Sequence, residues 1–470
     1  MSVGDRRPIL FVSRPESGLL NPMLVLAGEL VDRGVPEVWY ATDESRRAQI
    51  EERGLKFVSL GAGPPELSLS TMDDAAYARF ASRSKFVSHR ESLQMVMQPK
   101  LMAEEYRRLT AAVDELKPAL MVIESASGFA HALAIARKIP FVATLPFLPS
   151  HSYASWVPLM AKSHLPKHFP RPNTGLPFPM NPVQKLKNML FGLRTLAMYM
   201  GKKMRPHLTE YVKLQQEAGI RREDTRADGQ VTESKFVMAF SVAEVDFPFP
   251  RPAGLRLTGA MVPPLPEAPG ANPVSEWLDA HESVVYIGLG TLQRLNRAEV
   301  AGIVEVARKL NGRHHVLWNL PKERHELLPP AAELPPNLRV ESWLPSQFDV
   351  LAHPSVKVFF THAGSNGFHE SLYFGKPMVT RPMFADCHDI ARRGESFGLS
   401  LTVNRPHLIE PEDIAAKLTR VLTEPSFRQA AERIAAIQQA AGGRERGADL
   451  IMELVNGELA PAPQALRSPH

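Results

Sequence analysis

The chain has 470 residues, of which 44% are hydrophobic and 22% charged, and its formal net charge is +5. This composition excludes an intrinsically disordered chain and leaves room for two domains with large cores. The basic excess is small and spread along the chain, without interleaved aromatic and basic residues, so nucleic acid is not an expected partner. A phosphate-bearing substrate or an anionic membrane surface would account for the excess equally well.

The single cysteine excludes an intramolecular disulfide and fits a reducing compartment, so we expect a cytoplasmic protein. The first 17 residues contain too short an apolar run for a signal peptide. No stretch is apolar and uncharged for long enough to span a bilayer, so no transmembrane segment is predicted. The sequence does not indicate an oligomeric state.

Strand and helix patterns alternate through the first 145 residues. Apolar runs rich in β-branched and aromatic residues predict strands at 8–12, 38–41, 57–60, 120–124 and 141–144. A helix is predicted at 21–33, with Asn21 as its N-cap, Pro22 in its first turn and Gly34 as its stop, and another at 127–137. This alternation predicts a parallel sheet that is covered by helices.

Residues 145–255 differ, because proline-rich stretches there surround helical segments. The segment 183–205 carries apolar residues at 183, 186, 189, 190, 193, 197 and 200, with Lys and Arg between them. Two interpretations are open: a helix that lies on a membrane surface, or an ordinary amphipathic helix that lines an apolar cleft or the domain core. We favour the second interpretation, since it is the commoner use of such a pattern.

A second α/β unit follows a proline-rich linker. Strands are predicted at 283–290, 315–318, 338–341 and 356–361, and helices at 297–309, 410–423 and 442–459. The predicted organisation is an N-terminal domain at 1–250, a linker at 251–273, a C-terminal domain at 274–445, and a final helix and tail at 446–470.

The strand at 356–361 leads through a short glycine-containing loop into a helix that is predicted from Phe368 and stops at Gly375. A helix N-terminus after such a loop favours a phosphate, because its backbone N–H groups and its dipole point at the ligand. Glu370 lies one turn into the helix after Asn366, where a carboxylate suits the two hydroxyls of a ribose. Trp343 offers a flat apolar face for a base. The pattern indicates a nucleoside diphosphate site without a lysine clamp or metal ligands.

The same region contains a longer series of fixed points. In order, they are Trp343-Leu344-Pro345-Ser346, Val350-Leu351-Ala352-His353, Phe359-Phe360-Thr361-His362-Ala363-Gly364-Ser365-Asn366-Gly367, Glu370, Gly375-Lys376-Pro377 and Pro382-Met383-Phe384-Ala385-Asp386-Cys387. This series resembles the signature of the family 1 glycosyltransferases, which use UDP-sugars. The resemblance implies the GT-B fold, in which two Rossmann-like domains face each other across a cleft. The C-terminal domain would bind the UDP-sugar and the N-terminal domain the acceptor.

The resemblance also implies a role for each donor-site residue. Trp343 would stack on uracil, His362 would contact the diphosphate, and Glu370 would bind the ribose hydroxyls. The further donor-binding residues are Gly290 and Thr291 at the diphosphate, Gly364, Asn366 and Gly367 at the helix start, and Asp386 at the sugar. Two positions depart from the pattern: Ser346 replaces a ribose-binding Gln, with Gln347 one residue later, and Cys387 replaces a sugar-binding Gln.

The family places a catalytic histidine in a G-H-x-x-P motif, oriented by an acid after a later strand. Here the motif is Gly18-Leu19-Leu20-Asn21-Pro22, so Leu19 stands at the histidine position and Glu124 at the place of the acid. Since a leucine cannot accept a proton, the base would be Glu16, Glu124 or His151, unless the acceptor ionises easily or the protein does not catalyse. We favour Glu16, because it lies in the same loop as Leu19. Leu19 and His151 are expected to line the acceptor site.

No metal or other cofactor is predicted, since the spacing of His362, His369, Glu370, His388 and Asp389 matches no ligand pattern. The predicted function is inverting, metal-independent transfer of a sugar, most simply glucose, from a UDP-sugar to a hydroxyl of a small apolar acceptor such as a phenolic, sterol or macrolide. One alternative is a catalytically silent relative that binds a nucleotide sugar or small molecule. The other is a nucleotide-dependent oxidoreductase, which an incomplete glycine fingerprint after the strand at 283–290 disfavours.

Overall fold

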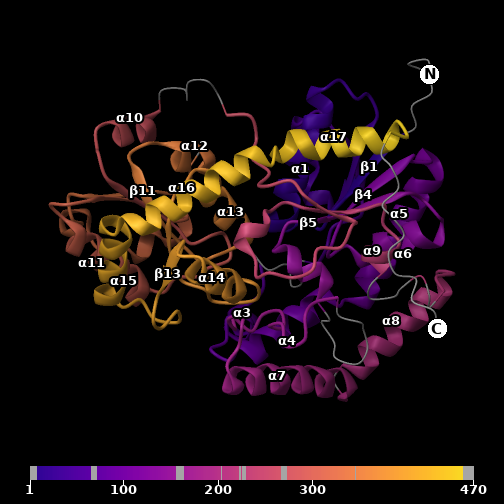
Figure 1. Cartoon of the computed structure of the whole chain (residues 1–470), viewed down its shortest axis with the longest axis horizontal. Coiled ribbons are helices and arrows are strands. Elements are labelled where there is room, and N and C mark those ends of the chain that lie inside the picture. The colour runs from indigo at the N-terminus through magenta and orange to yellow at the C-terminus, as the bar shows by residue number, and fades with distance from the viewer. Residues whose placement is uncertain are drawn as a thin grey trace. The chain divides into compact units, whose positions relative to one another are not determined.

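The computed structural model describes residues 8–64, 71–154, 164–202, 204–221, 224, 229–265, 272–344 and 346–458. Contacts divide the chain into two compact units, both visible in Figure 1. The first unit comprises Met1–Phe80, Ser84–Met261 and Ala441–His470, and the second comprises Ala81–Arg83 and Val262–Ala440. Each unit is built around its own parallel sheet.

The first unit contains a seven-stranded sheet in the order β3-β2-β1-β4-β5-β6-β7, and its strands pair in parallel. The strands are β1 (Ile9–Val12), β2 (Val38–Thr42), β3 (Lys56–Ser59), β4 (Leu120–Glu124), β5 (Phe141–Leu145), β6 (Val237–Ala239) and β7 (Leu255–Leu257). The helices are α1 (Ser17–Asp32), α2 (Arg47–Glu52), α3 (Asp74–Phe80), α4 (Lys85–Val96), α5 (Pro99–Leu116), α6 (Gly128–Ala136), α7 (Pro182–Met200), α8 (Arg205–Glu217), α9 (Gly229–Thr232) and α17 (Gly443–Val455).

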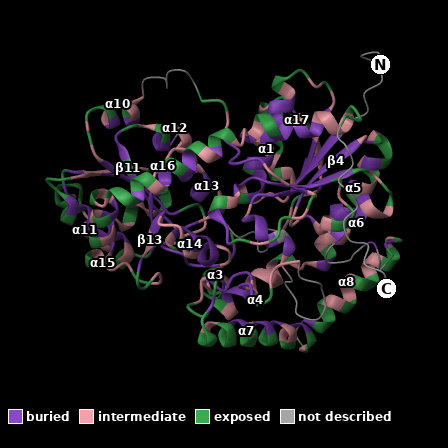
Figure 2. Ribbon diagram, viewed as in Figure 1, coloured by how far each residue is buried: buried purple, intermediate pink, exposed green. Residues whose placement is uncertain are grey.

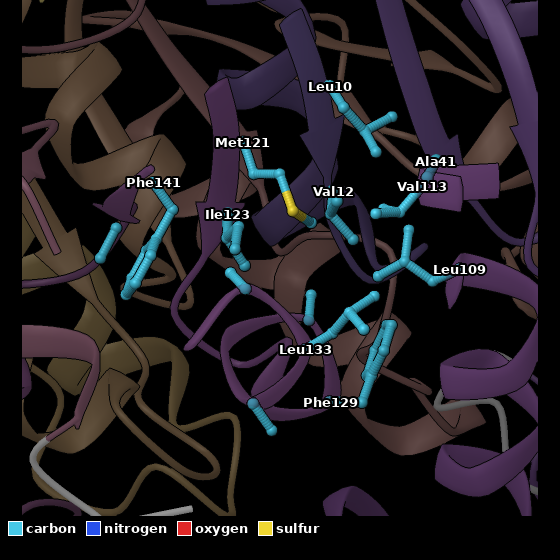
Figure 3. Packing of buried hydrophobic residues seen from close by; sticks show 14 of the residues in the cluster. Leu10, Val12, Ala41, Leu109, Val113, Met121, Ile123, Phe129, Leu133 and Phe141 are labelled. Carbon is cyan, nitrogen blue, oxygen red and sulfur yellow. The ribbon is translucent and has the colours of Figure 1, made fainter. Parts of the chain in front are cut away.

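Helices cover both faces of this sheet. Successive residues of each strand point to opposite faces, so the strands contribute apolar side chains to both layers of helices. On one face, Leu10 and Met121 pack against Leu109 of α5 and Leu133 of α6, as Figure 3 shows. On the other face, residues such as Phe11 and Val122 pack against the buried sides of α1 and α17. The strands are therefore apolar without interruption, as expected for a sheet buried on both sides.

The predicted start of the first helix was wrong. The Asn21-Pro22 pair resembled an N-cap followed by the first helical residue, yet α1 begins four residues earlier, at Ser17, and contains Pro22. Leu19 and Leu20 are buried in the first turn, and Leu20 belongs to the core on that face of the sheet. Burial of these leucines outweighs the cost of the proline. Leu19 consequently lies in a helix, and Glu16 is its N-cap residue.

The second unit contains a six-stranded sheet in the order β10-β9-β8-β11-β12-β13, and its strands also pair in parallel. The strands are β8 (Val284–Gly288), β9 (His315–Asn319), β10 (Leu338–Glu341), β11 (Val356–Thr361), β12 (Met378–Thr380) and β13 (Ser400–Thr402). The helices are α10 (Pro273–Asp279), α11 (Arg297–Leu310), α12 (Gln347–Ala352), α13 (Ser365–Tyr373), α14 (Cys387–Ser396), α15 (Pro411–Thr423) and α16 (Pro425–Ala440).

Each sheet has one point at which the direction of strand addition reverses. In the first sheet it lies between β1 and β4, and in the second between β8 and β11. In open parallel sheets, ligands bind outside the carboxyl ends of the strands at such a point. Glu16 and Glu124 follow or end the two strands at the first point, and Gly290 and His362 follow those at the second.

Two segments near the predicted domain boundaries have definite places. The range predicted as a linker contains β7, and its residues 266–271 lie outside the described part of the chain. Helix α17 packs along α1, as Figure 1 shows, and Arg33 donates to Asp449 over 2.6 Å. Residues 459–470 of the predicted tail are also outside the described residues.

The segment predicted as one amphipathic helix at 183–205 forms two helices, since α7 ends at Met200 and α8 begins at Arg205. The expectation that its apolar residues face a cleft or the core was wrong. Leu186, Met189 and Leu193 are each at least half exposed. No helix among the described residues is long and apolar enough to cross a membrane.

Candidate donor site and candidate catalytic carboxylates

The loop between β11 and α13 forms a candidate anion site. Ala363 adopts a left-handed backbone with φ of 63°, which turns the chain sharply after His362. Helix α13 begins at Ser365, three residues before the predicted start, with Gly364 as its N-cap. Glycine has no side chain, so the N-cap residue itself does not bond to the first-turn amides. These amides, which include those of Asn366 and Gly367, are therefore positioned to bind an anion.

His362 fits closely between two glycines. A Cβ atom placed on Gly290 would lie 2.5 Å from the Cε1 atom of His362, and one on Gly364 would lie 2.3 Å from its Nε2 atom. Gly290 also has a φ of +76°, which side-chain-bearing residues rarely adopt. Any larger residue at either position would displace the imidazole, so these glycines hold open the place that the ring occupies.

His362 is a neutral, desolvated hydrogen-bonding group. Burial lowers its pKa to about 4, so the imidazole carries no charge at neutral pH. Its Nδ1 atom is buried and has no hydrogen-bond partner among the residues that the structure describes. A buried ring nitrogen of this kind is costly unless a ligand satisfies it. The ring is thus suited to a hydrogen bond with a diphosphate or sugar oxygen.

A chain of hydrogen bonds holds Glu370, the candidate ribose ligand. The Gln347 amide donates from Nε2 to the Oε2 atom of Glu370 over 2.6 Å, and the Tyr286 hydroxyl donates to the Gln347 Oε1 atom over 3.0 Å. The Tyr286 ring stacks on Phe359, with centroids 4.8 Å apart, which fixes the start of the chain. Desolvation raises the pKa of Glu370 to about 7, while the hydrogen bond from Gln347 lowers it.

The departure from the family pattern at Ser346 has a structural reason. The Ser346 hydroxyl accepts a hydrogen bond from the Asp349 amide over 3.1 Å and caps α12. Gln347, one residue later, is the residue whose side chain reaches Glu370. The side chain of Gln347, and not that of Ser346, is therefore the one that faces the candidate ribose ligand.

The remaining residues that were predicted to bind the donor follow strands of the same sheet. Trp343, after β10, is 70% exposed and presents its indole to solvent. Thr291 is exposed after β8. Asp386 is the N-cap residue of α14 and is half-buried, whereas the neighbouring Cys387 side chain is only 2% exposed, and burial raises the pKa of its thiol.

Arg381 is a residue of this edge that the sequence did not reveal. It follows β12, is 1% exposed, and donates to the Gln293 Oε1 atom over 2.9 Å and to the Pro406 carbonyl over 2.7 Å. It also forms an ion pair with Glu299. It therefore ties the loop after β8 to the loop after β12. In the sequence it is one of many basic residues, and only its neighbours show its role.

The two carboxylates that were predicted in the first unit lie where the direction of strand addition reverses, after β1 and at the end of β4. Glu124 ends β4 with no exposed surface, and its Oε1 atom accepts from the Ala126 amide over 2.6 Å and from the Ser125 hydroxyl over 2.9 Å. Desolvation raises the pKa of Glu124 to about 7, and the negative charge of Glu16 adds to the rise. Glu16 itself is 28% exposed at its side chain.

Sequence reasoning missed a third carboxylate in this group. Glu105 of α5 is 8% exposed, and its Oε2 atom lies 3.6 Å from the Nη1 atom of Arg14. Arg14 also lies 3.8 Å from Glu16, so one guanidinium stands between two carboxylates. Desolvation raises the pKa of Glu105 to about 7, and Arg14 opposes that rise. No sequence pattern pointed to Glu105, since it is far from the loop after β1 and its helix was not predicted.

The two predicted acceptor-site residues lie on different elements. Leu19 is in the first turn of α1 and is 9% exposed. His151 is in a short 3-10 helix, Pro149–Tyr153, after β5, and its ring lies 6.0 Å from that of Phe147. A different histidine touches Glu124: the Nε2 atom of His131 lies 3.2 Å from the Glu124 carbonyl oxygen. Burial lowers the pKa of His131 to about 4.

The described residues contain no group of three or more His, Cys, Asp or Glu side chains that could hold a metal ion. His369 and His353 have structural partners instead. The Nδ1 atom of His369 lies 2.8 Å from the Ser365 carbonyl oxygen, and His353 lies within hydrogen-bond distance of Ser355 and Asp279.

The chain belongs to a known family. The family described as "UDP-glucoronosyl and UDP-glucosyl transferase" matches residues 69–441, which include the whole signature block. The resemblance found in the sequence is thereby confirmed.

Curated relatives match at moderate identity. UDP-glucuronosyltransferase 2B17 of Rattus norvegicus is 26% identical over 330 residues, which cover 69% of this chain and 58% of the relative. UDP-glucuronosyltransferase 2A3 of Cavia porcellus is 31% identical over 202 residues, which cover 41% of this chain and 35% of the relative. The matched part of the chain thus spans less than two thirds of the length of each of these relatives.

Solved structures match over nearly their full length. The glycotransferase of kitacinnamycin superposes with a TM-score of 0.68 at 21% identity, covering 96% of this chain and 99% of that one. The calicheamicin glycosyltransferase CalG4 gives 0.65 at 20% identity, covering 97% and 100%. A UDP-glucose: anthocyanidin 3-O-glucosyltransferase in complex with UDP gives 0.62 at 17%, covering 96% and 99%. The predicted fold class, α/β with two Rossmann-like domains of the GT-B type, is confirmed.

Proposed function

We propose that this protein is an inverting UDP-glycosyltransferase that moves a sugar, most simply glucose, to a hydroxyl of a small apolar acceptor such as a phenolic, sterol or macrolide. The observation that carries the proposal is the group of residues at the edge of the second sheet. There the neutral His362 and the N-terminus of α13 suit a diphosphate, and the carboxylate of Glu370 suits the ribose hydroxyls. Family membership points the same way.

In this proposal the donor binds through the second unit. The α13 amides and His362 hold the diphosphate, Glu370 accepts hydrogen bonds from the ribose, and Trp343 stacks on the base. Asp386 contacts the sugar. The helix N-terminus and His362 stabilise the negative charge that develops on the departing UDP, so the reaction needs no metal ion.

The acceptor would bind at the first unit. Its hydroxyl oxygen attacks C1 of the sugar, the bond from C1 to the diphosphate oxygen breaks, and UDP leaves with the electron pair. The hydroxyl proton passes to a carboxylate. Glu16 is the proposed base, because its side chain is 28% exposed and accessible to an acceptor, whereas Glu124 is fully buried.

The test is release of UDP from UDP-glucose, UDP-galactose and UDP-glucuronic acid with a mixed set of phenolic, sterol and macrolide acceptors. We expect acceptor-dependent UDP release with at least one pair, undiminished by excess EDTA. Loss of activity on chelation, with recovery when Mg²⁺ or Mn²⁺ is added, would contradict the metal-free mechanism. Failure to bind any UDP-sugar in calorimetry would remove the donor site.

A second candidate function is supported by one observation, namely Leu19 at the position of the family's catalytic histidine. A leucine cannot transfer a proton, so the protein would then bind a nucleotide sugar without transferring the sugar. Binding of UDP-sugars without UDP release for any acceptor favours this silent binder. A cytoplasmic location is also part of our proposal and is based on the single cysteine.

A further inference from the structure

Helix α7 has its apolar and polar faces reversed relative to an ordinary surface helix. Its exposed large hydrophobic residues are Val183, Leu186, Met189, Leu190, Leu193 and Met200, with exposures from 47% to 72%. Figure 2 shows exposed residues along the outer side of the helix. The residues that α7 buries are Asn188, Gly192, Thr195 and Tyr199. A water-facing helix would present the opposite pattern.

The buried face of α7 makes specific contacts, and these contacts fix the rotation of the helix about its axis. The Asn188 side chain accepts from the Arg171 amide and donates to the Phe169 carbonyl, both over 2.9 Å. A Cβ atom on Gly192 would lie 2.3 Å from the Nε atom of Arg171, so a larger residue there would push the Arg171 guanidinium out of its place against the helix. Rotating the helix to bury its leucines would break these contacts.

The polar residues beside the exposed apolar face are basic. Lys185 and Lys187 are exposed near the start of α7, and Arg194 lies with its guanidinium 4.2 Å from the Phe86 ring centroid. Where α7 gives way to α8, a surface hollow of about 590 Å³ is lined by Lys202, Arg205, Pro206, Thr209, Glu210 and Lys213.

This charge pattern extends beyond the helix. Between positions 125 and 209 the sequence has 11 Lys and Arg residues and no Asp or Glu, although the net charge of the whole chain is only +5. The remaining residues therefore carry a net charge of −6, by subtraction of 11 from 5. The basic excess is therefore concentrated in one segment. The expectation from the composition, that the excess is spread along the chain, was wrong.

We propose that α7 is a docking surface for an anionic phospholipid bilayer. An exposed apolar stripe flanked by Lys and Arg on a helix of 19 residues matches a helix that lies in the membrane interface. The apolar side chains enter the acyl boundary, while the cations meet the lipid phosphates. A second copy of the chain is a poorer occupant, because a two-fold contact through this face would set like charges against each other.

The test is co-sedimentation of the full chain with vesicles of 30% phosphatidylglycerol in phosphatidylcholine, against vesicles of phosphatidylcholine alone. We expect binding to the anionic vesicles and at least tenfold weaker binding to the neutral ones. Raising NaCl from 0.05 to 0.5 M should release most of the bound protein, since screening weakens the contribution of the cations. Absence of binding to the anionic vesicles at low salt overturns the proposal.

Two double variants separate the apolar and electrostatic contributions. Lys185→Gln with Lys187→Gln should weaken binding by about 25-fold, from roughly fivefold for each basic residue near an anionic surface. Leu186→Gln with Leu193→Gln should weaken binding by about tenfold or more. Each substitution removes the free energy gained when the exposed half of a leucine side chain moves from water into the bilayer. Both pairs are exposed, so thermal unfolding midpoints should not change.

The matched controls are Arg313→Gln with Lys322→Gln, which changes two exposed cations of the second unit, and Leu408→Gln, which changes an exposed leucine there. These should bind vesicles as the wild type does. Equal loss in controls and α7 variants would overturn the assignment of the surface. A second outcome would also overturn it: the protein sediments as a dimer, and the leucine double variant abolishes the dimer but still binds vesicles. In that case α7 would be an interface between copies of the chain.

Discussion

The affinity of this protein for a UDP-sugar should depend on the protonation of Glu370. Burial raises the pKa of this carboxyl group to about 7, compared with about 4.3 for an unperturbed glutamate. The ionised carboxylate can accept hydrogen bonds from both ribose hydroxyls, whereas the protonated acid uses one oxygen as a donor. The ionised form is therefore the form that binds the donor well.

The sign and size of the effect follow from that pKa. Below pH 7 the group is mostly protonated and must release its proton before it binds, at about 1.4 kcal/mol, or tenfold, for each pH unit. At pH 8 the group is mostly ionised and this cost disappears. We expect the affinity for UDP-glucose to be about tenfold lower at pH 6 than at pH 8. Gln347→Ala removes the hydrogen bond that favours the ionised form, so the midpoint should move to higher pH.

Calorimetry with UDP-glucose at pH 6, 7 and 8 measures this dependence without a competing titration. Both phosphates of UDP-glucose are esterified, so the ligand lacks the phosphate ionisation near pH 6 that complicates UDP itself. His362 does not titrate in this range either, because its pKa is about 4. The matched variant is Glu370→Gln, which should bind more weakly at pH 8 and show no pH dependence.

A flat profile in the wild-type protein would refute the reasoning. A slope that persists unchanged in Glu370→Gln would assign the titration to another group. A midpoint that does not move in Gln347→Ala would show that the hydrogen bond seen over 2.6 Å does not favour the ionised carboxylate.

Three further predictions concern the same two sites. Glu124→Gln should raise the free energy of unfolding by roughly 1–3 kcal/mol at pH 8 and by much less near pH 5, as measured by urea unfolding. The reason is that a raised carboxyl pKa costs stability only as pH rises from about 4.3 towards 7. An equal gain at both pH values contradicts this prediction. Gly364→Ala should weaken UDP-glucose binding by about 1–3 kcal/mol by displacing His362, while Gly254→Ala, which has open space, should not. Glu16→Gln should lower kcat by about 10²-fold and leave UDP-glucose binding intact; normal turnover moves the base elsewhere.

Much of the fold could be predicted because its strands carry a strong local signal. The runs at 120–124 and 356–361 are buried strands with the predicted bounds, since β-branched and aromatic residues fill a sheet covered on both faces. The three-residue strands β6, β7, β12 and β13 were not predicted. Runs of that length carry little periodicity, and their pairing depends on neighbours that are distant in the sequence.

The candidate donor site was easier to predict than its support. His362, Glu370 and Trp343 lie in one sequence block with fixed spacing, so the block alone suggested their roles. Tyr286 and Arg381 act through hydrogen bonds to Gln347 and Gln293, which lie 61 and 88 residues away. A linear pattern cannot show such partners, because only the folded sheet brings their strands to one edge.

The same distinction explains why the outward face of α7 was misjudged. The spacing of Leu186, Leu190 and Leu193 correctly indicates one apolar face, but periodicity does not say which way that face points. The direction is set by Asn188 and Gly192, whose contacts with the loop before α7 are invisible in the sequence.

The loss of the histidine at Leu19 also has a physical consequence for any catalysis here. A histidine at that buried first-turn position would pay a desolvation cost, and Glu124 would stay ionised to support it. With leucine there, Glu124 faces the charge of Glu16 instead, which helps to raise its pKa to about 7. In the proposed mechanism, Glu16, Glu124 and Arg14 would take the place of the imidazole and its acid. In the proposed mechanism the buried Glu124, whose pKa lies near neutral pH, keeps a proton more readily than an ordinary glutamate, and the more exposed Glu16 is the group that the acceptor hydroxyl can reach.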